Sequence, residues 1–204
     1  MIPTIAPYLL PAVIGHITVA HPEIDLLVRE TMTQKLVEEL SDGKLDCAIV
    51  ALPVSEPALT EVALFDEAMV LVRPAHDAGR PVPDMDTLSQ MKLLLLEEGH
   101  CFRDQALSFC SLRNTLPREG LDGSSLSTLV QMVGAGIGVT LIPEMAVPVE
   151  TRSASVDIAP LGAPHPMRTV GMIWRKSSAM SEKLDAIAKL VRDAASTHPA
   201  FAKD

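Results

Sequence analysis

A chain of 204 residues, of which 48% are apolar, can bury one large core or two small ones and is not disordered. The net charge of −9 argues against binding of nucleic acid or of an anionic membrane by this sequence. If the protein binds DNA, another segment must do so. The sequence shows no signal peptide, no apolar run of about 18 residues and no metal-ligand spacing among its three cysteines and six histidines. We therefore expect a cytoplasmic domain with no membrane partner, no metal and no cofactor.

The N-terminal part of the chain alternates between helical and strand patterns. Apolar residues recur at helical spacing over 7–24, and the segment 25–30 predicts a short strand. The pattern of 33–44 is typical of an amphipathic helix, and the continuous apolar run 45–52 predicts a strand buried on both faces. This order of helices and strands favours a parallel α/β sheet.

The rest of the chain continues the alternation and predicts an α/β fold of two Rossmann-like lobes with two chain crossovers. We assign residues 1–68 and 170–204 to the first subdomain and 69–169 to the second, with crossings near 66–72 and 166–172. The further predicted elements are a strand pair over 61–76 broken at Asp66 and Glu67, strands at 92–98, 137–147 and 168–176, a helix after residue 98, and helices at 125–136 and 181–196.

The segment "EEGHCFRDQALSFC" (97–110) holds two of the three cysteines, at the point where a strand ends and a helix begins. Ligands bind at such points in open α/β sheets, and backbone N–H groups at a helix start favour negative charge. A cysteine placed there can have its pKa lowered from about 8.5 to between roughly 3.5 and 7.5. Cys101 therefore has the setting of a reactive thiolate, and its sequence neighbours His100 and Arg103 are candidates to add positive charge.

The local sequence around each of the other two cysteines predicts an ordinary, unreactive thiol. Cys110 follows Phe109 on an apolar helix, and Cys47 lies in a predicted buried strand, where cysteines are inert. Nine residues of α-helix rise about 13.5 Å and turn by about 900°, whereas a disulfide needs Cα atoms within about 7 Å. Either Cys101 and Cys110 never bond, or bonding unravels the helix and makes the segment a switch.

The same segment resembles the sensor segment of the peroxide-responsive LysR-type transcription regulators. "IPTIAPYLLP", "KLDCAIVAL", "LFDEAMVLV", "GAGIGVTLIPEMAVP" and "RTVGMIWR" are similar to the effector domain of that family, in the same order. The "VGAGIGVTLIP" stretch occurs widely in LysR-type effector domains, whereas the GHC-x-RDQA-x-x-FC pattern is much more specific. The resemblance implies two α/β subdomains like those of a small periplasmic binding protein, and an N-terminal winged helix-turn-helix that this sequence does not contain.

By this resemblance, the Cys101 thiolate attacks hydrogen peroxide and becomes a sulfenic acid, and Cys110 resolves it as a reversible disulfide. The sequence departs from the family at Gln34, where the resemblance implies histidine, and over 111–123. The resemblance also implies a peroxide pocket around the reactive sulfur, formed by Thr4, Thr33, His100, Asp104 and Arg168.

Each of these residues also has a purely structural interpretation. Thr4 and Thr33 suit helix N-caps, and Asp104 suits the first turn of a helix on dipole grounds. Arg168 suits a surface ion pair, and His100 suits a role in shaping its loop. Three glycines are expected to form a tight helix-to-strand connection rather than a phosphate cradle: Gly134, Gly136 and Gly138.

The resemblance implies a transcription activator of oxidative-stress genes rather than an enzyme. It further implies a homodimer of this domain, a tetramer of the full-length protein, contacts with DNA and RNA polymerase only through that full-length protein, and reduction by glutaredoxin- or thioredoxin-type proteins. Two alternatives stay open, namely a LysR-type effector domain that binds a small organic ligand, and a thiol peroxidase. A transport solute-binding protein is disfavoured because no signal peptide is found.

Overall fold

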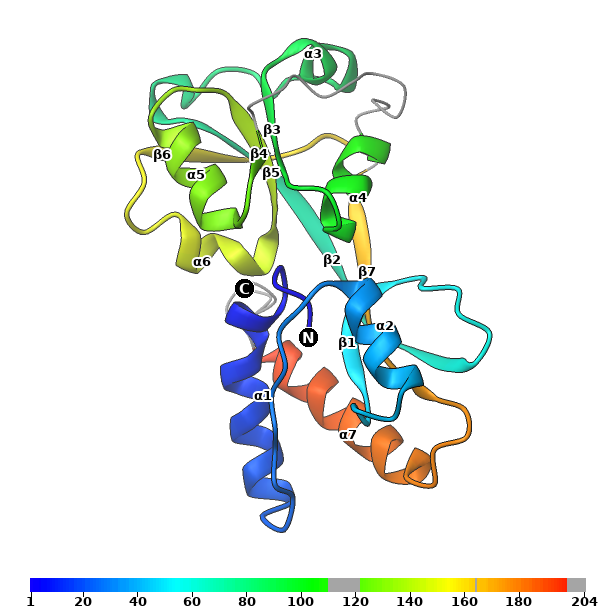
Figure 1. The fold of residues 1–204 in the computed structure, drawn as a ribbon. Coiled ribbons are helices and arrows are strands. Elements are labelled where there is room, and N and C mark those ends of the chain that lie inside the picture. Colours follow the sequence, from blue (N-terminus) through cyan, green and yellow to red (C-terminus); the bar gives the residue numbers. More distant parts are fainter. Residues whose placement is uncertain (110–121, 164, 198–204) are drawn as a thin grey trace. The chain divides into compact units, whose positions relative to one another are not determined.

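The computed structural model describes residues 1–109, 122–163 and 165–197 (Figure 1). The chain divides into two compact units. The first unit comprises Met1–Glu67 and Arg168–Asp204, and the second comprises Ala68–Met167. Within the described residues, no helix is long and apolar enough to cross a bilayer.

The first unit combines helices with β1, β7 and the first part of β2, and β7 lies between the other two strands. Helix α1 packs along α7, and α2 contacts β1 (Figure 1). Strand β1 pairs antiparallel with β7, with Ala48 opposite Ile173 and Leu52 opposite Thr169. The elements are α1 (Ala6–Ala20), α2 (Thr33–Ser41), β1 (Ala48–Leu52), β7 (Met167–Arg175) and α7 (Ser181–Ser196).

The core of the first unit follows from the apolar spacing of its helices. Leu9, Val13 and Ile17 of α1 recur every fourth residue and are buried, as are Leu184 and Val191 of α7. Apolar stripes of this kind stabilise a helix mainly by removing its inner face from water. The packing of α1 against α7 therefore holds this side of the unit together.

The second unit is built on a mixed sheet. Strand β3 pairs in parallel with β5 on one side and with β4 on the other, while β2 pairs antiparallel with β5 and β6. The order of strands is β6-β2-β5-β3-β4. The strands are β2 (Leu59–Pro74), β3 (Leu93–Leu96), β4 (Asp122–Gly123), β5 (Val139–Pro143) and β6 (Val156–Pro160).

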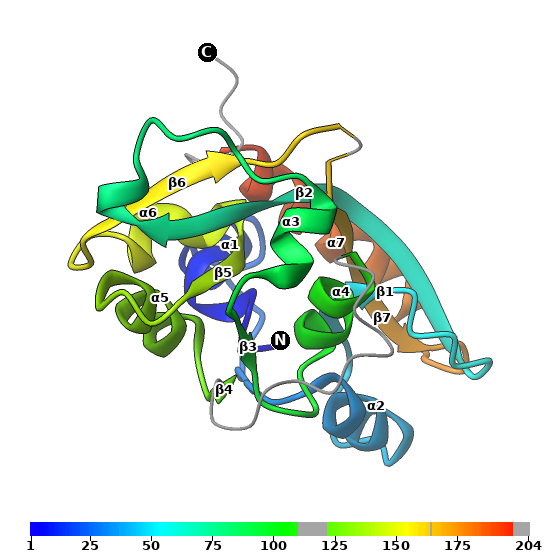
Figure 2. The same cartoon turned by 90° about the horizontal axis from the view of Figure 1, so that it is seen from above.

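Helices cover both faces of this sheet. Figures 1 and 2 place α4 and α5 on opposite sides of β3 and β5. Leu88 of α3 and Ala106 of α4 join one buried core with Leu71, Leu95 and Leu141 of the strands, so the apolar face of α4 is anchored on the sheet. The remaining elements are η1 (Ala75–Asp77), α3 (Met85–Gln90), α4 (Cys101–Phe109), α5 (Leu126–Gly134), η2 (Glu144–Ala146) and α6 (Val147–Glu150).

The predicted break at Asp66 and Glu67 is wrong, because β2 runs without interruption through both residues. The exposed Asp66 accepts a hydrogen bond from the Thr169 hydroxyl at 2.6 Å. The buried Glu67 lies 2.7 Å from the Arg168 guanidinium. Both carboxylates thus have partners, and a charged side chain with a partner does not end a strand.

The predicted strand at 25–30 is also not formed, although the segment is extended. The Met1 amino group donates to the Arg29 carbonyl at 2.7 Å, and the Thr31 N–H donates to the Met1 carbonyl at 3.2 Å. Leu27 is 87% exposed. These bonds reach only one end of the segment, whereas a strand needs a ladder along its length.

Strand β1 does not pair in parallel, although the order of elements in the sequence favours a parallel sheet. The partner of β1 is β7, which comes from the far end of the chain and runs antiparallel to it. Local alternation of helices and strands does not reveal such a partner. The short elements α3, α6 and β6 were not predicted either, because four to six residues carry too little periodicity.

The glycines after α5 form the tight connection that the sequence predicts. Gly136 has φ of +79°, a left-handed conformation that glycine adopts without strain. A Cβ on Gly138 would collide with the Lys92 carbonyl oxygen, so glycine is required where β5 approaches β3. Both glycines are thus required by the local backbone where α5 connects to β5.

Candidate functional site

Cys101 is the first residue of α4, directly after the turn that follows β3. The turn contains Gly99 with φ of +93°, a backbone conformation that favours glycine. The Cys101 side chain is partly exposed, and no disulfide joins it to another described residue. Cys101 is therefore an accessible free thiol at the first position of a nine-residue helix.

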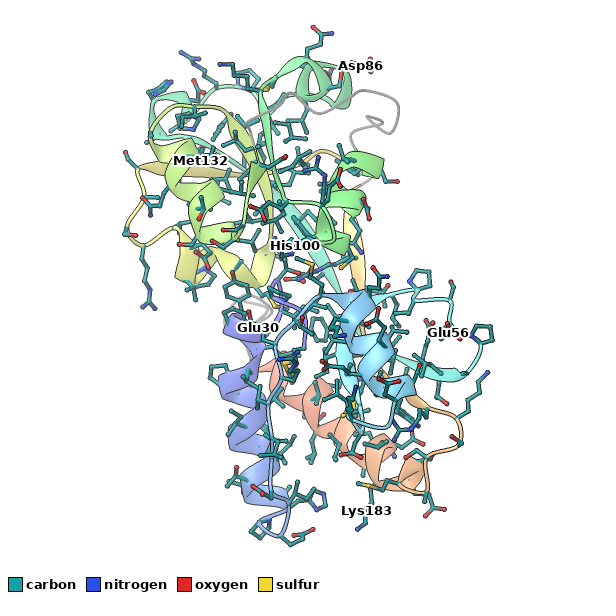
Figure 3. The ribbon with its side chains drawn as sticks, in the orientation of Figure 1. Glu30, Glu56, Asp86, His100, Met132 and Lys183 are labelled. Atoms are coloured by element: carbon teal, nitrogen blue, oxygen red, sulfur yellow. The ribbon has the colours of Figure 1, made fainter. Side chains whose placement is uncertain are left out.

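His100 is buried just before this helix and is labelled in Figure 3. Burial lowers the pKa of His100, and the negative charge of Glu97 offsets part of this effect. The neutral imidazole is therefore favoured at neutral pH. Burial thus disfavours the positive charge that His100 could have added near Cys101.

Arg103 does not supply a free positive charge either. Its side chain is buried, and Nη1 donates to the Leu96 carbonyl at 2.6 Å and to Asp122 Oδ1 at 2.7 Å. The Asp122 carboxylate compensates its charge, so Arg103 connects α4 to the end of β3 and to β4. Its role is to hold the helix in place.

Asp104 lies exposed in the first turn of α4 and lines an open cavity of about 350 Å³ within the second unit. Its neighbour Gln105 lines the same cavity, and the Gln105 side-chain oxygen is buried without a hydrogen-bond partner among the described residues. The other lining residues are Met69, Ser108, Phe109, Pro166 and Met167. The Asp104 carboxylate can therefore interact with a ligand in the cavity, in addition to its favourable interaction with the dipole of α4.

Thr4 and Arg168 are brought together in the first unit. Arg168 Nη1 donates to Thr4 Oγ1, and Nη2 donates to the Thr4 carbonyl, each at 2.9 Å. Arg168 Nε also donates to Glu67 Oε2 at 2.7 Å. All three residues are buried, so the surface ion pair considered for Arg168 is not what forms. The α1 N-cap position belongs to Ile5, so Thr4 is not the cap.

Thr33 is the first residue of α2, and it does not cap that helix either, because the N-cap position is Met32. The Thr33 hydroxyl oxygen is inaccessible to solvent and has no hydrogen-bond partner among the described residues. An orphaned buried hydroxyl is rare in folded proteins and marks a place where a ligand or water completes the bonding. The neighbouring Gln34 is exposed.

Two further residues complete the comparison between prediction and structure. Cys110 lies outside the described residues. Glu67 was missed as a polar partner of Arg168, because its charge was taken as the end of a strand. An acid within an otherwise apolar strand, together with an arginine at the start of a late strand, is the signal that could have revealed the pair.

The Thr33→Val substitution should leave the free energy of unfolding unchanged or raise it by up to about 1 kcal/mol, because it removes an unpaired buried hydroxyl. Thr4→Val is the matched control and should lose about 1–2 kcal/mol, since it leaves an Arg168 N–H without its acceptor. Urea denaturation followed by fluorescence of the buried Trp174 measures both. A larger loss for Thr33→Val than for Thr4→Val would contradict this interpretation.

The lowered pKa of His100 predicts a pH dependence of stability. The unfolded chain, with its ordinary histidine pKa of 6.5, binds more protons in acid than the folded chain does. Stability should therefore fall as the pH drops below that value. In His100→Asn the loss of stability between pH 7 and pH 5 should be smaller than in the unmodified chain. An equal loss in both proteins would show that His100 does not contribute.

The sequence and the fold both match known proteins. The model of the LysR substrate binding domain matches residues 1–196. The DNA-binding transcriptional dual regulator OxyR of Escherichia coli K12 is 40% identical over 194 residues, which are 94% of this chain and 64% of that protein. This chain thus spans just under two thirds of that relative's length.

Solved structures agree with this assignment. The hydrogen-peroxide-bound form of a Corynebacterium glutamicum OxyR mutant matches with a TM-score of 0.90 and 32% identity, over 98% of this chain and 64% of that chain. The reduced OxyR regulatory domain of Pseudomonas aeruginosa matches with a TM-score of 0.85 and 35% identity, over 97% of this chain and 95% of that chain. These matches confirm the predicted α/β effector-domain fold. The chain therefore belongs to the LysR substrate-binding domain family and, within it, to the OxyR regulatory domains.

Proposed function

We propose that this chain is the peroxide-sensing regulatory domain of a LysR-type transcription regulator, and that Cys101 is the residue that reacts with hydrogen peroxide. One observation carries the proposal. Cys101 is a partly exposed free thiol at the start of a helix, in a chain that is related to OxyR proteins over nearly its whole length. A thiol must be accessible to peroxide in order to react with it, and the partial exposure of Cys101 meets this requirement.

The proposed reaction balances in two steps. The Cys101 thiolate attacks one peroxide oxygen, the O–O bond breaks, and a sulfenic acid forms while hydroxide leaves and takes up a proton to become water. The Cys110 thiol then attacks the sulfenic sulfur, which forms the disulfide and releases a second water. A dithiol protein of the glutaredoxin or thioredoxin type supplies the two electrons that restore both thiols. One peroxide is consumed per switching event, and the proposed role is that of a sensor in which the disulfide is the signal and peroxide removal is not the purpose.

The helix itself implies that this disulfide remodels the structure. Residues Cys101–Phe109 are helical, so the Cα atom of Phe109 lies about 12 Å along the axis from that of Cys101. One further peptide adds a reach of only about 3.8 Å. A disulfide requires less than about 7 Å. Oxidation must therefore unwind part of α4.

The remaining predicted residues are proposed to support the same reaction. The resemblance assigns His100 and Asp104 of the second unit, and Thr4, Thr33 and Arg168 of the first unit, to the binding of peroxide. The orphaned Thr33 hydroxyl and the Thr4 hydroxyl held by Arg168 support this role, because peroxide needs both donors and acceptors.

The change in α4 is proposed to act through a cytoplasmic homodimer of this domain, within a tetramer of the full-length regulator. DNA and RNA polymerase are contacted through that full-length protein, which activates oxidative-stress genes. Helix α1 supports the dimer, because its sequence APYLLPAVIGHITVA carries no charged side chain and it exposes Ile14 and Val19.

The proposal is tested by adding an equimolar amount of hydrogen peroxide to the reduced protein, counting free thiols and mapping disulfides by mass spectrometry. Two thiols should disappear together with the appearance of a Cys101–Cys110 peptide. In Cys110→Ser, dimedone should instead trap a sulfenic acid at Cys101. Unchanged thiols under these conditions would refute the proposal.

The cavity beside Asp104 and Gln105 favours a second candidate, which is the binding of a small organic ligand. Its volume of about 350 Å³ suits such a ligand. This candidate would be favoured if a metabolite raised the melting temperature of the protein and peroxide did not oxidise its thiols. Sustained consumption of peroxide with a reductant present would instead favour a thiol peroxidase.

A further inference from the structure

Arg103 joins the first turn of α4 to the ends of two strands of the second unit. Its side chain is only 7% exposed, and Nη1 donates to the Leu96 carbonyl at the end of β3 and to Asp122 Oδ1 at the start of β4. Strands β3 and β4 pair in parallel at this point, with Leu96 opposite Gly123. The contact therefore fixes the first turn of α4 on the edge of the sheet that β4 forms.

The Arg103–Asp122 pair acts on the segment that the disulfide rearranges. Arg103 lies between Cys101 and Cys110 in the chain, and α4 must lose part of its helix before the two sulfur atoms can bond. A buried guanidinium that is carried away from its carboxylate leaves a charge without compensation, which is costly. A contact that is made in the reduced form and lost in the oxidised form shifts the equilibrium between them toward the reduced form.

We propose that Asp122 is a positioning residue for the redox switch: through Arg103 it holds α4 helical, and it thereby sets the reduction potential of the Cys101–Cys110 pair. This inference rests on the proposed function, which supplies the disulfide. Because the Asp122 carboxylate stabilises the dithiol form, it makes the disulfide easier to reduce and raises the reduction potential. The residue acts on the equilibrium between the two forms and takes no part in the reaction with peroxide.

The test measures that equilibrium in Asp122→Asn, which keeps the shape of the side chain and removes its charge. Each protein is equilibrated with mixtures of reduced and oxidised glutathione, in which two glutathione thiols reduce the Cys101–Cys110 disulfide to two thiols and become one glutathione disulfide. Mass spectrometry after acid quenching quantifies both forms of the protein. The equilibrium constant for reduction should fall by about tenfold, roughly the loss of one charge-assisted hydrogen bond, which lowers the reduction potential by about 30 mV.

Asp157→Asn is the matched control. In the same unit, Arg73 Nε donates to Asp157 Oδ2 at 2.7 Å, and the arginine and aspartate side chains are 8% and 27% exposed. The corresponding values for Arg103 and Asp122 are 7% and 36%, so the two pairs are similarly buried. The control pair joins β2 to β6 and has no residue on α4. Its loss should leave the equilibrium constant for reduction within about twofold of that of the unmodified chain.

Urea denaturation of the two redox forms separates a positioning role from a merely structural one. If the pair favours the reduced form, Asp122→Asn should lower the midpoint urea concentration of the reduced protein and leave that of the oxidised protein unchanged. Asp157→Asn should lower both midpoints by the same amount. Equal losses in the two forms of Asp122→Asn, with an unchanged reduction potential, would overturn the inference.

A double-mutant cycle tests whether Asp122 acts through Arg103. Arg103→Met should also lower the equilibrium constant for reduction, and Asp122→Asn should then change it by less than about a further twofold. Multiplied effects in the double variant would show that Asp122 does not act through the arginine, and the inference would be wrong. If Asp122→Asn does not fold, Asp122→Glu, which keeps the charge on a longer side chain, should shift the equilibrium in the same direction by a smaller factor.

The inference and the proposed function fail in different ways. If peroxide produces no Cys101–Cys110 disulfide in the unmodified chain, the proposed function is refuted. If that disulfide forms and has the same reduction potential in Asp122→Asn as in the unmodified chain, only the role of Asp122 is refuted.

Discussion

Cys101→Ser is expected to abolish the response to peroxide and to slow the peroxide-dependent loss of thiols by on the order of 10³-fold or more. The reacting species is a thiolate, and a serine hydroxyl at the same position neither ionises at neutral pH nor takes up the peroxide oxygen. The measurement is the time course of free thiols after peroxide is added to the reduced protein. Cys110 should survive in this variant, because it loses the sulfenic acid with which it condenses.

Cys47→Ser is the control that the chain itself offers. Burial raises the pKa of the Cys47 thiol to about 11, with a smaller contribution from the charge of Asp46. At pH 7 its thiolate fraction is then about 10⁻⁴, roughly 100 times below that of a thiol with the reference pKa of 9.0. Cys47→Ser should therefore react with peroxide as fast as the unmodified chain. A response that follows Cys47 instead of Cys101 would refute the assignment of the sensing thiol.

Arg168→Met should lower the free energy of unfolding by about 3–5 kcal/mol, the largest loss of stability we expect from a single substitution in this site. The variant leaves the Glu67 carboxylate buried without the guanidinium that compensates it, and it removes both donors to Thr4. Because Trp174 lies in the same unit and is buried, its fluorescence in a urea titration reports the loss.

The double variant Glu67→Met/Arg168→Met provides the decisive comparison. Replacing both charged side chains with methionine leaves no buried charge without a partner and allows an apolar contact. Most of the free energy of unfolding lost in Arg168→Met should therefore be regained. Arg29→Met should have a far smaller effect, because Arg29 pairs with Glu39 at the surface and its charge stays hydrated. A small loss for Arg168→Met, or no recovery in the double variant, would show that the buried pair does not form as described.

Regular apolar spacing made much of the fold predictable. The helix predicted over 181–196 coincides with α7, because Leu184, Ala188 and Val191 bury a face that repeats at the helical period. The start of α4 at Cys101 could also be predicted, since a buried strand, a glycine turn and an acid in the next turn form a recognisable sequence. Both predictions depend only on residues close together in the chain.

The parts that could not be predicted depend on distant partners. Glu67 and Arg168 are 101 positions apart, so the sequence around Glu67 shows a charge that interrupts a strand and does not show what compensates it. Arg103 was expected to act on Cys101, but Asp122, which is 19 positions away, takes up its charge. The segment 25–30 has strand composition, yet pairing depends on neighbours that composition does not reveal.

The Arg103–Asp122 contact has a consequence for the kinetics of disulfide formation. It joins two residues that lie on either side of Cys110 in the chain, two positions after Cys101 and twelve positions after Cys110. Cys110 is also only nine residues from Cys101 in the same chain, so its thiol has a far higher effective concentration at the sulfenic acid than the thiols of other chains have. Closure of the disulfide should accordingly be first order in protein, and thiols of other chains at micromolar concentration should not compete with it.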